Sequence, residues 1–400
     1  MCMEDPSRQC KGMLIITAPG QGAQAPGFLA PWLELPGVAE RLGAAGELAG
    51  CDLIKAGTTA GAEEITDTAV AQPLLVAAAL AAAGALAGGR GGDVRAEAAA
   101  GHSVGELAAG VIAGVLAEDD AMRLVRVRGT AMAAAAAAEP TGMTAVLGGE
   151  VDAVLAAIGK AGLTPANVNG AGQVVAAGAV AALNALAADP PSGARLRPLQ
   201  VAGAFHTAYM APAVAALRGA AAGVAVADPA MTLLSDADGA AVTTGKEWLE
   251  RIVAQVAAPV RWDLCMATMA DLGVTAFIEL PPAGTLAGLA KRALPGVAVC
   301  ALKTPGQLDA ARDMLAEHAA AGLVPAHLPE WRLVVAPTSG TFRPCGAPGQ
   351  VGVVVTRGGE HPVTAPWDLA PSQIIEWLAE DGDPVSEGQP LVRVQPAEAR

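Results

Sequence analysis

The stretch Gly101-His102-Ser103-Val104-Gly105 decides how this chain folds. It follows the apolar run Val94–Ala100 and precedes the helical pattern Glu106–Leu116, so it predicts a sharp turn from a buried strand into a helix. Glycines two residues before and after Ser103 avoid Cβ clashes in such a turn. At a helix N-terminus the serine would lie beside N–H groups that stabilise a developing oxyanion. Ser103 is therefore the candidate nucleophile, and a structural turn without chemistry is the alternative.

A nucleophilic serine needs a general base, and the chain has five histidines. His206 follows a strand pattern that ends at Phe205, where the catalytic edge of the sheet is expected. His102 is adjacent to Ser103 and is expected to point elsewhere and to pack in the interior. The remaining histidines fall where a solvated or structural role is the default: His318, His327 and His361. His206 is the preferred base.

Strand and helix patterns alternate on both sides of the turn. The strand Met13–Ala18 runs into the Gly-rich loop Pro19–Gln24, and helical patterns follow at Ala30–Leu48 and Ala69–Leu86. The alternation returns after residue 232 with the strands Thr232–Leu234, Ala276–Leu280 and Val297–Leu302 and the helices Glu247–Gln255, Trp262–Leu272, Leu286–Ala293 and Gly306–Ala321. This order predicts an α/β fold with a parallel sheet covered by helices on both faces.

Between these parts the order changes to βαββαβ, which predicts an inserted ferredoxin-like unit. Its elements are the strands Thr144–Leu147, Thr164–Asn169, Gln173–Ala177 and Arg195–Ala202 and the helices Asp152–Ala161 and Val180–Ala188. The predicted domains are a disordered leader (1–12), a core (13–139 and 206–321), the inserted unit (140–205), a linker (322–330) and a small all-β module (331–400).

Composition narrows the class of protein. The chain has 400 residues, of which 53% are apolar and 16% charged, so it can bury a large core. A net charge of −14 argues against a general nucleic-acid binder. The six cysteines show no metal-binding spacing, so no metal is expected. The longest apolar run, Leu74–Gly89, is shorter than the roughly 20 residues of a membrane span. With no signal-peptide pattern at the start, a cytoplasmic protein without a membrane segment is expected.

Seven motifs in register carry a resemblance to a known family. They are Gly20–Gln24, Gln72-Pro73, Gly101–Glu106, Arg126–Gly129, Asn167–Asn169 with Gly172–Val175, Gly203–His206, and Gln255 before Pro259-Val260. Together they resemble the malonyl-CoA:acyl-carrier-protein transacylases over about residues 13–320. The resemblance implies an α/β-hydrolase-like core with the ferredoxin-like insert. It also implies ping-pong transfer of a malonyl group from malonyl-CoA, through Ser103, to the phosphopantetheine thiol of acyl carrier protein in fatty-acid synthesis.

The resemblance also implies a role for each matching residue. His206 would be the general base, and the main-chain carbonyl of Gln255 would fix its tautomer. Arg128 would bind the malonyl carboxylate as a bidentate partner, a task that suits a planar guanidinium. The other implied residues are Gln21 and Val104 for the oxyanion-hole N–H groups, Gln72 for the pocket wall, and Phe205 for selection against a branched acyl group. No cofactor is implied.

Several points stay open. Pro281-Pro-Ala-Gly284 replaces the usual Gly-Pro-Gly, and Thr207-Ala-Tyr-Met210 varies the usual Ser-Pro-Leu-Met. An acidic carrier would need a local basic face, and the compact candidates are Lys291, Arg292, Arg195 and Arg197. Alternatives are a malonyl-loading enzyme of polyketide synthesis, a serine hydrolase, and a scaffold with a relict site. Arg128 argues against a hydrolase, because a general esterase needs no buried cation for a free carboxylate.

The last 70 residues resemble the second half of a biotinyl or lipoyl carrier domain, in pieces such as Ile374–Val385 and Glu387–Val392. Such a carrier needs a lysine at a hairpin tip. The corresponding stretch, Thr356–Glu360, has none, and no lysine follows Lys303. Attachment of biotin or lipoate is therefore not expected, and the module is interpreted as a docking or spacer domain. A purely stabilising appendage is the alternative.

Overall fold

The computed structural model describes residues 12–88, 94–320, 332–345, 350–364, 374–386 and 388–394. The predicted leader, except Gly12, and the predicted linker at 322–330 lie outside these residues. Parts of the predicted C-terminal module do so as well.

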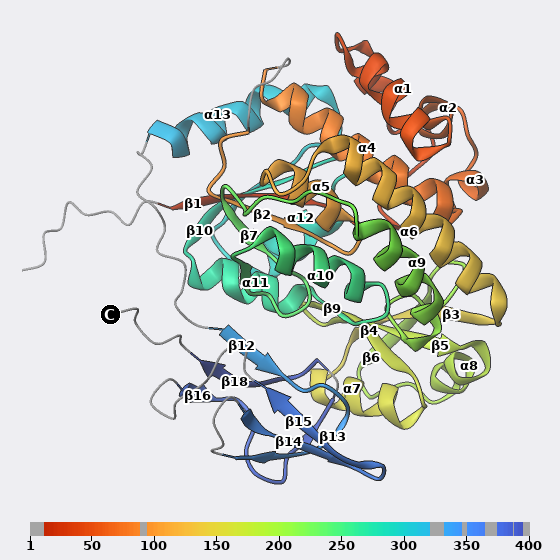
Figure 1. Cartoon of the computed structure of the whole chain (residues 1–400), viewed down its shortest axis with the longest axis vertical. Coiled ribbons are helices and arrows are strands. Elements are labelled where there is room, and N and C mark those ends of the chain that lie inside the picture. Colours follow the sequence, from red (N-terminus) through yellow and green to blue (C-terminus); the bar gives the residue numbers. More distant parts are fainter. Residues whose placement is uncertain are drawn as a thin grey trace, which may run out of the picture.

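A six-stranded sheet forms the centre of the larger body (Figure 1). Its order is β11-β10-β1-β2-β7-β8, with strands at Ala298–Ala301, Val274–Glu279, Met13–Ala18, Ala98–Gly101, Thr232–Leu234 and Ala241–Val242. The first five strands are parallel, which confirms the predicted parallel sheet. The edge strand β8 is antiparallel to β7 and was not predicted, because two residues carry no periodicity.

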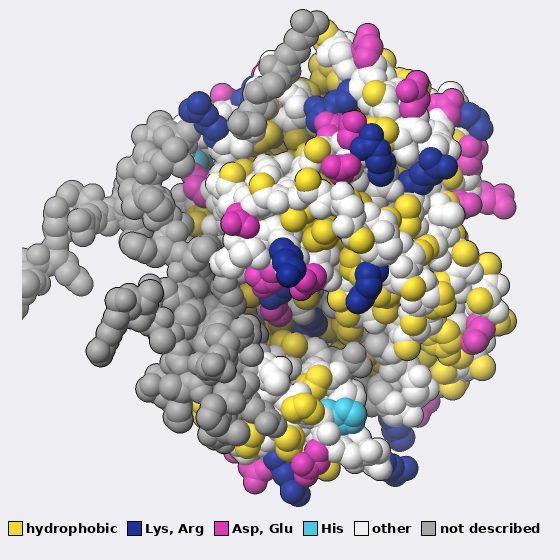
Figure 2. All heavy atoms as spheres, viewed as in Figure 1, with side chains coloured by type: hydrophobic (Ala, Val, Ile, Leu, Met, Phe, Trp, Pro, Cys, Tyr) yellow, Lys and Arg dark blue, Asp and Glu magenta, His cyan; other side chains and the backbone are white. Residues whose placement is uncertain are grey.

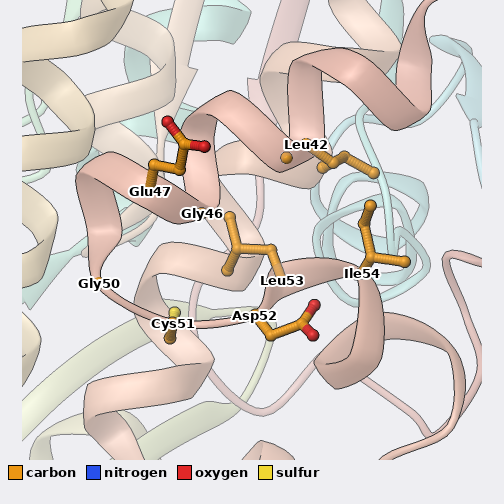
Figure 3. A pocket seen from close by; sticks show the side chains of 9 residues that line it. Leu42, Gly46, Glu47, Gly50, Cys51, Asp52, Leu53 and Ile54 are labelled. Carbon is orange, nitrogen blue, oxygen red and sulfur yellow. The ribbon is translucent and has the colours of Figure 1, made fainter.

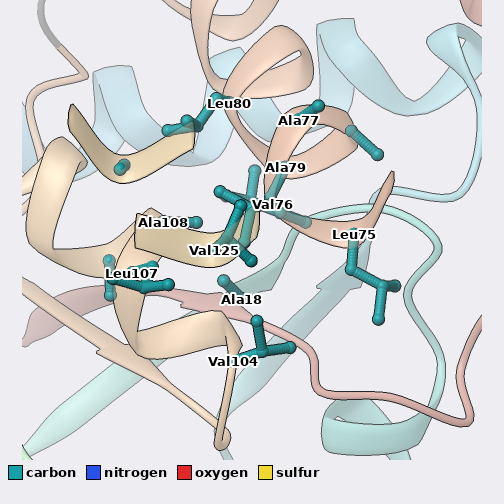
Figure 4. Close-up of a cluster of buried hydrophobic side chains, with 14 of the residues drawn as sticks. Ala18, Leu75, Val76, Ala77, Ala79, Leu80, Val104, Leu107, Ala108 and Val125 are labelled. Carbon is teal, nitrogen blue, oxygen red and sulfur yellow. The ribbon is translucent and has the colours of Figure 1, made fainter. Parts of the chain in front are cut away.

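Alternate side chains of β1 bury themselves on opposite faces of this sheet. Leu14 and Ile16 join the larger apolar cluster, whereas Met13 and Ile15 join a second cluster on the other face. Figure 4 shows part of the first cluster, in which Leu75, Val104 and Val125 come from separate elements. The helices that supply most of it are α1 (Val38–Ala49), α4 (Thr68–Leu86), α5 (Gly105–Ile112) and α6 (Glu118–Ala138). Helices α11 (Trp262–Asp271) and α12 (Thr285–Ala293) supply the second cluster, so both faces are covered.

Some predicted element boundaries were wrong. The helix predicted at Ala30–Leu48 is a 3-10 turn at Ala30–Glu34 followed by α1, because Pro36 and Gly37 interrupt the helical backbone. Strand β2 begins at Ala98 rather than Val94, and β6 (Ala194–Pro198) ends before the predicted Ala202. The remaining elements of the larger body are α2 (Leu53–Thr58), α3 (Ala62–Thr66), α9 (Ala211–Ala221), α10 (Gly245–Gln255) and α13 (Leu308–Ala320), with 3-10 turns at Ala208–Met210 and Pro305–Gln307.

A second sheet follows β2 in the chain, in the strand and helix order that the sequence predicts. Its elements are β3 (Thr141–Gly148), α7 (Val151–Lys160), β4 (Thr164–Gly170), β5 (Gln173–Ala179), α8 (Val180–Ala188) and β6. The sheet order is β6-β3-β5-β4-β9, and the first four strands pair antiparallel. The fifth strand, β9 (Val260–Arg261), comes from outside the predicted insert and pairs parallel with β4. This short strand joins the second sheet to the segment after α10.

The C-terminal part is all β in its described residues, as predicted. Two sheets with the orders β12-β18-β16 and β15-β14-β13-β17 enclose an apolar cluster that includes Phe342, Val354 and Leu391. The strands are β12 (Arg332–Val335), β13 (Gly340–Pro344), β14 (Gln350–Thr356), β15 (Gly359–Thr364), β16 (Ile374–Trp377), β17 (Pro384–Val385) and β18 (Pro390–Val394). The guanidinium of Arg261 donates a hydrogen bond to the carbonyl of Gly388, which links this part to β9.

Helix α4 is long and apolar enough to cross a membrane by length and composition, and it is the single such helix among the described residues. Its most apolar window is 78% buried inside the protein, between α1, α5 and α6. Burial of this kind is typical of a core helix, so the feature does not indicate a membrane span.

Candidate active site

The turn between β2 and α5 places Ser103 in a left-handed backbone conformation, with φ of 53°. The two glycines have a steric cause. A Cβ on Gly101 would lie 2.1 Å from the Glu106 nitrogen, and one on Gly105 would lie 2.2 Å from the Ala18 carbonyl oxygen. Gly101 therefore packs against the start of α5 and Gly105 against the end of β1, so closely that only glycine fits at either position. A strained serine between a strand and a helix is the arrangement of a nucleophile elbow.

His206 lies against this serine. Its Nε2 is 2.7 Å from Ser103 Oγ, and its Nδ1 is 2.8 Å from the main-chain carbonyl oxygen of Gln255. Since a carbonyl can only accept, Nδ1 carries the proton and Nε2 is free to accept one. Burial, and secondly the charge of Arg128, lower the pKa of His206 to about 3. The imidazole is thus neutral and correctly oriented to take the serine proton.

Arg128 supplies a buried cation beside Ser103. It lies on α6 with 1% of its surface exposed. Its Nη2 donates to Ser103 Oγ at 3.1 Å and to Gln255 Oε1 at 2.8 Å, and its Nη1 donates to Gln72 Oε1 at 2.6 Å. A Cβ on Gly129 would lie 2.9 Å from the Thr68 carbonyl oxygen, so this glycine lets α6 approach the start of α4, where Gln72 lies. Burial lowers the pKa of Arg128 to about 10, and the group remains charged at neutral pH.

These groups face a cavity of about 760 Å³ between the two sheets of the larger body. Of the residues predicted for the site, the cavity is lined by Gln21, Gln72, Ser103, Val104, Arg128, Arg197, Phe205 and His206. Gln255 is buried behind Arg128 and His206 and touches both. The other three predicted basic residues, Arg195, Lys291 and Arg292, are exposed and are not among the lining residues.

The loop after β1 lines the same cavity as Ser103. The Gln21 side chain donates to the Thr66 carbonyl and to Thr68 Oγ1, both at 3.3 Å, which ties the loop to the start of α4. Among the described residues, the main-chain N–H groups of Gln21 and Val104 have no hydrogen-bond acceptor. Two free N–H groups beside a nucleophile can receive an oxyanion.

His102 packs as the sequence predicts. Its Nε2 lies 2.9 Å from Asn169 Oδ1, and its ring contacts that of Trp262 with centroids 5.8 Å apart. His102 therefore joins the turn to the second sheet and leaves His206 as the histidine that faces Ser103.

The sequence reasoning missed two buried carboxyl groups, Glu106 and Asp236, which have exposures of 1% and 0%. Glu106 is the last residue of the motif Gly101–Glu106, but no role was predicted for it, because an acid in the first turn of a helix is ordinary. Asp236 lies 133 residues from Ser103 in the chain, and only the sheet order brings the two together.

Hydrogen bonds hold the two segments that depart from the family pattern, 281–284 and 207–210. The Glu279 carboxylate accepts from the main-chain nitrogens of Gly284, Leu286 and Ala287, which holds the Pro281–Gly284 loop against the start of α12. Thr207 donates to the Ala204 carbonyl at 2.7 Å and accepts from the Tyr209 nitrogen. Neither change removes a group from the cavity.

A second, smaller pocket lies between the end of α1 and α2 (Figure 3). Its lining includes Glu47, Cys51 and Asp52 but no residue of the cavity around Ser103. In the described part of the chain, no group of three or more His, Cys, Asp or Glu side chains could hold a metal ion.

Comparison with known proteins defines the class. A family profile for the acyl transferase domain matches residues 19–322. A malonyl CoA-acyl carrier protein transacylase of Mycobacterium tuberculosis is 55% identical over 300 residues, which cover 74% of this chain and 98% of that protein. A crystal structure of this enzyme from the same species superposes with a TM-score of 0.72 at 54% identity, over 75% of this chain and 99% of that one.

A further solved structure is a malonyl-transacylase in complex with a type II polyketide-synthase acyl-carrier protein, with 28% identity, a TM-score of 0.70, and coverage of 76% of this chain and all of that one. The chain therefore belongs to the malonyl-CoA:acyl-carrier-protein transacylase family of acyltransferases.

Proposed function

We infer that this chain transfers the malonyl group of malonyl-CoA to the phosphopantetheine thiol of acyl carrier protein. The observation that carries this conclusion is the buried guanidinium of Arg128, 3.1 Å from the nucleophile oxygen. In a malonyl thioester one methylene separates the carboxylate from the reacting carbonyl carbon. A cation within hydrogen-bond reach of the nucleophile therefore matches a donor with a carboxylate at that position.

The reaction proceeds in two half-reactions, with proton transfers through His206. Ser103 Oγ gives its proton to His206 Nε2 and bonds to the thioester carbon, and the N–H groups of Gln21 and Val104 receive the oxyanion. The C–S bond then breaks, and His206 returns the proton to the CoA sulfur. In the second half, the carrier thiol gives its proton to His206 and attacks the malonyl-serine ester. Cleavage of the ester C–O bond then returns the proton to Ser103.

The remaining residues bind the malonyl group and select it against branched acyl groups. Arg128 would exchange its bonds to neutral oxygens for the malonyl carboxylate, with Gln72 alongside. Phe205 is 5% exposed and lines the cavity, so its ring would crowd a methyl branch on the acyl group. Such discrimination is worth about 1–3 kcal/mol. No step of this mechanism needs a cofactor.

We also propose a division of the larger body into two subdomains. The larger body is an α/β-hydrolase-like core at 13–139 and 206–321 with a ferredoxin-like insert at 140–205. The antiparallel order β6-β3-β5-β4 supports the insert, and β9 extends its sheet. The cavity lined by Ser103, Arg128 and His206 lies between the two sheets, which supports an active site where core and insert meet.

Docking of an acidic carrier is assigned to the rim of the cavity. Arg197 lines the cavity, and Arg195 lies two residues along β6 and so on the same face of the strand. On the face shown in Figure 2, basic side chains lie beside acidic ones. Arg251, for example, forms ion pairs with Asp238 and Glu247. Arg197 is therefore the first candidate, and Arg195, Lys291 and Arg292 are secondary ones. A cytoplasmic location fits these soluble partners.

The C-terminal module is proposed to be a carrier-like domain without an attachment lysine, which docks a partner or serves as a spacer. The β14–β15 hairpin turns at Thr356–Gly359, and its tip holds Arg357 and Gly358. An arginine at this place cannot form the amide that biotin or lipoate requires.

Acceptor dependence is the decisive test of function. Purified protein with malonyl-CoA and holo acyl carrier protein should give malonyl-carrier and free CoA. Without carrier, CoA release should stop after about one equivalent per enzyme. Continuous release of malonate at the same rate without carrier would instead identify a hydrolase. Comparing carriers of fatty-acid and polyketide synthesis by kcat/KM separates the two pathways.

A further inference from the structure

Glu106 and Asp236 form a buried pair of carboxyl groups directly behind the nucleophile. Asp236 Oδ2 accepts from the Ser103 main-chain nitrogen at 2.6 Å, and Glu106 Oε1 accepts from the Asp236 nitrogen at 2.8 Å. The pair thus joins the loop after β7 to the turn before α5. The pair thus binds the main-chain N–H of Ser103, the residue with the left-handed backbone conformation.

The amide of Gln255 connects this pair with the rest of the site. Its Nε2 lies 2.5 Å from Glu106 Oε2, 3.0 and 3.1 Å from the two Asp236 oxygens, and 3.1 Å from the Ser103 carbonyl. An amide nitrogen has two hydrogens, too few for three acceptor groups. Two bare carboxylates so close together in a buried site also repel each other strongly. A proton held by the pair removes both difficulties.

We propose that Asp236 is a positioning residue, which together with Glu106 forms a proton-holding carboxyl pair that fixes the Ser103 peptide and sets how strongly Arg128 attracts a carboxylate. The proposal rests on the proposed function. Among the described residues, the Arg128 guanidinium makes no direct ion pair, and its hydrogen bonds go to Gln72, Gln255 and Ser103. The negative charge that balances Arg128 therefore lies on the carboxyl pair, and the side-chain amide of Gln255 lies between the two.

This arrangement predicts a pH dependence with a definite sign. Burial raises the pKa of Asp236 to about 7 and that of Glu106 well above its usual range. Each proton that the pair loses adds negative charge near Arg128, so rising pH should weaken binding of the malonyl carboxylate. The other charged or titratable groups that face the pair or its partners are Arg128, Arg251, Asp238, Cys265 and His206.

The test measures the rate of acyl-enzyme formation by rapid quench, with malonyl-CoA and with acetyl-CoA, between pH 6 and 8.5. For wild type, the apparent affinity for malonyl-CoA should fall about tenfold over this range, and that for acetyl-CoA should not. Asp236→Asn keeps an oxygen for the Ser103 N–H. It should acylate within about threefold of wild type at saturation and lose the pH dependence. Asp236→Ala leaves that N–H unpaired and should acylate about 10 to 100 times more slowly.

Asp238→Asn is the matched control, because Asp238 lies two residues along the same loop and pairs with Arg251 instead. It should behave as wild type. The proposal is overturned if Asp236→Asn retains the wild-type pH dependence, or if folded Asp236→Ala acylates as fast as wild type. Asp236→Asn keeps the test valid if Asp236→Ala does not fold. Wild type that forms no malonyl adduct would instead contradict the proposed function.

Discussion

Ser103 Oγ lies 2.7 Å from His206 Nε2, and both residues have a left-handed backbone, with φ of 53° and 60°. Such conformations are rare for residues with a side chain, and they persist where the surrounding structure enforces them. At Ser103 the enforcing contacts are the packing of Gly101 and Gly105 and the bond to Asp236. The strained backbone conformations thus belong to the two residues between whose side chains the proposed proton transfer takes place.

The low pKa of His206 predicts how activity and stability respond to acid. Because the pKa is about 3, the saturated acylation rate should show no fall centred near pH 6.5. A rate that halves near pH 6.5 in both wild type and Asp236→Asn would contradict this prediction.

The lowered pKa of His206 also makes the free energy of unfolding depend on pH. In the unfolded chain His206 titrates near its ordinary pKa of 6.5, whereas in the fold it stays neutral down to about 3. The unfolded state therefore binds the proton first, and stability is lost as pH falls from 6.5 towards 3. Urea unfolding at pH 7 and pH 5 should show that wild type loses more stability than His206→Ala. Equal losses would show that His206 is protonated in the fold.

Arg128→Ala should weaken malonyl-CoA use far more than acetyl-CoA use. Removing one partner of a buried charge-assisted bond costs about 2–5 kcal/mol, so kcat/KM for malonyl-CoA should fall at least about 30-fold. The control is Arg123→Ala on the same helix, since Arg123 is exposed and pairs with Asp119 and Asp120. An equal loss for both acyl donors would remove the carboxylate-binding role.

Gly105→Ala tests the packing of the turn. The added Cβ would lie 2.2 Å from the Ala18 carbonyl oxygen, so the turn must shift, and a loss of about 1–3 kcal/mol in unfolding free energy is expected. Gly159→Ala in α7 is the control, because nothing lies within 4 Å of its Cβ. Alanine there should be neutral or stabilising. If thermal melts show Gly105→Ala to be more stable than Gly159→Ala, the turn has space for a Cβ at residue 105.

Arg197→Glu tests docking at the rim of the cavity. Reversing a rim charge slows association with an acidic partner, so KM for the carrier should rise about tenfold and less at high salt. KM for malonyl-CoA in the first half-reaction serves as the comparison. Arg218→Glu on α9 is an exposed control outside the cavity lining. If KM for the carrier is unchanged in Arg197→Glu, the carrier docks on another face of the protein.

The sequence predicts most of the fold because its signals are local. The strand before Ser103, the glycines around it and the apolar run of α4 can each be recognised within twenty residues. It gives no range for the helices α2, α3, α6 and α9. It also misses β8 and β9, which are two residues long and exist only through their partners. Their pairing partners lie in other parts of the chain, so no local pattern reveals them.

The site divides in the same way. Ser103, His206 and Arg128 stand in motifs, and the structure brings their side chains together. Asp236 stands in no motif, and Glu106 closes the motif Gly101–Glu106 without a predicted role, because the importance of both arises from burial and from each other. Gln255 was predicted for its main-chain carbonyl, but its side chain also bonds to Arg128 and approaches both carboxyl groups. Such a role depends on three-dimensional neighbours.

The central claim is that Ser103 carries the malonyl group between donor and carrier. Intact-mass analysis after brief mixing with malonyl-CoA should show one malonyl adduct, which peptide mapping places on Ser103. Adding holo acyl carrier protein should remove the adduct and yield malonyl-carrier in equal amount, and Ser103→Ala should form no adduct. An adduct that persists in Ser103→Ala, or one that the carrier cannot discharge, would contradict the account.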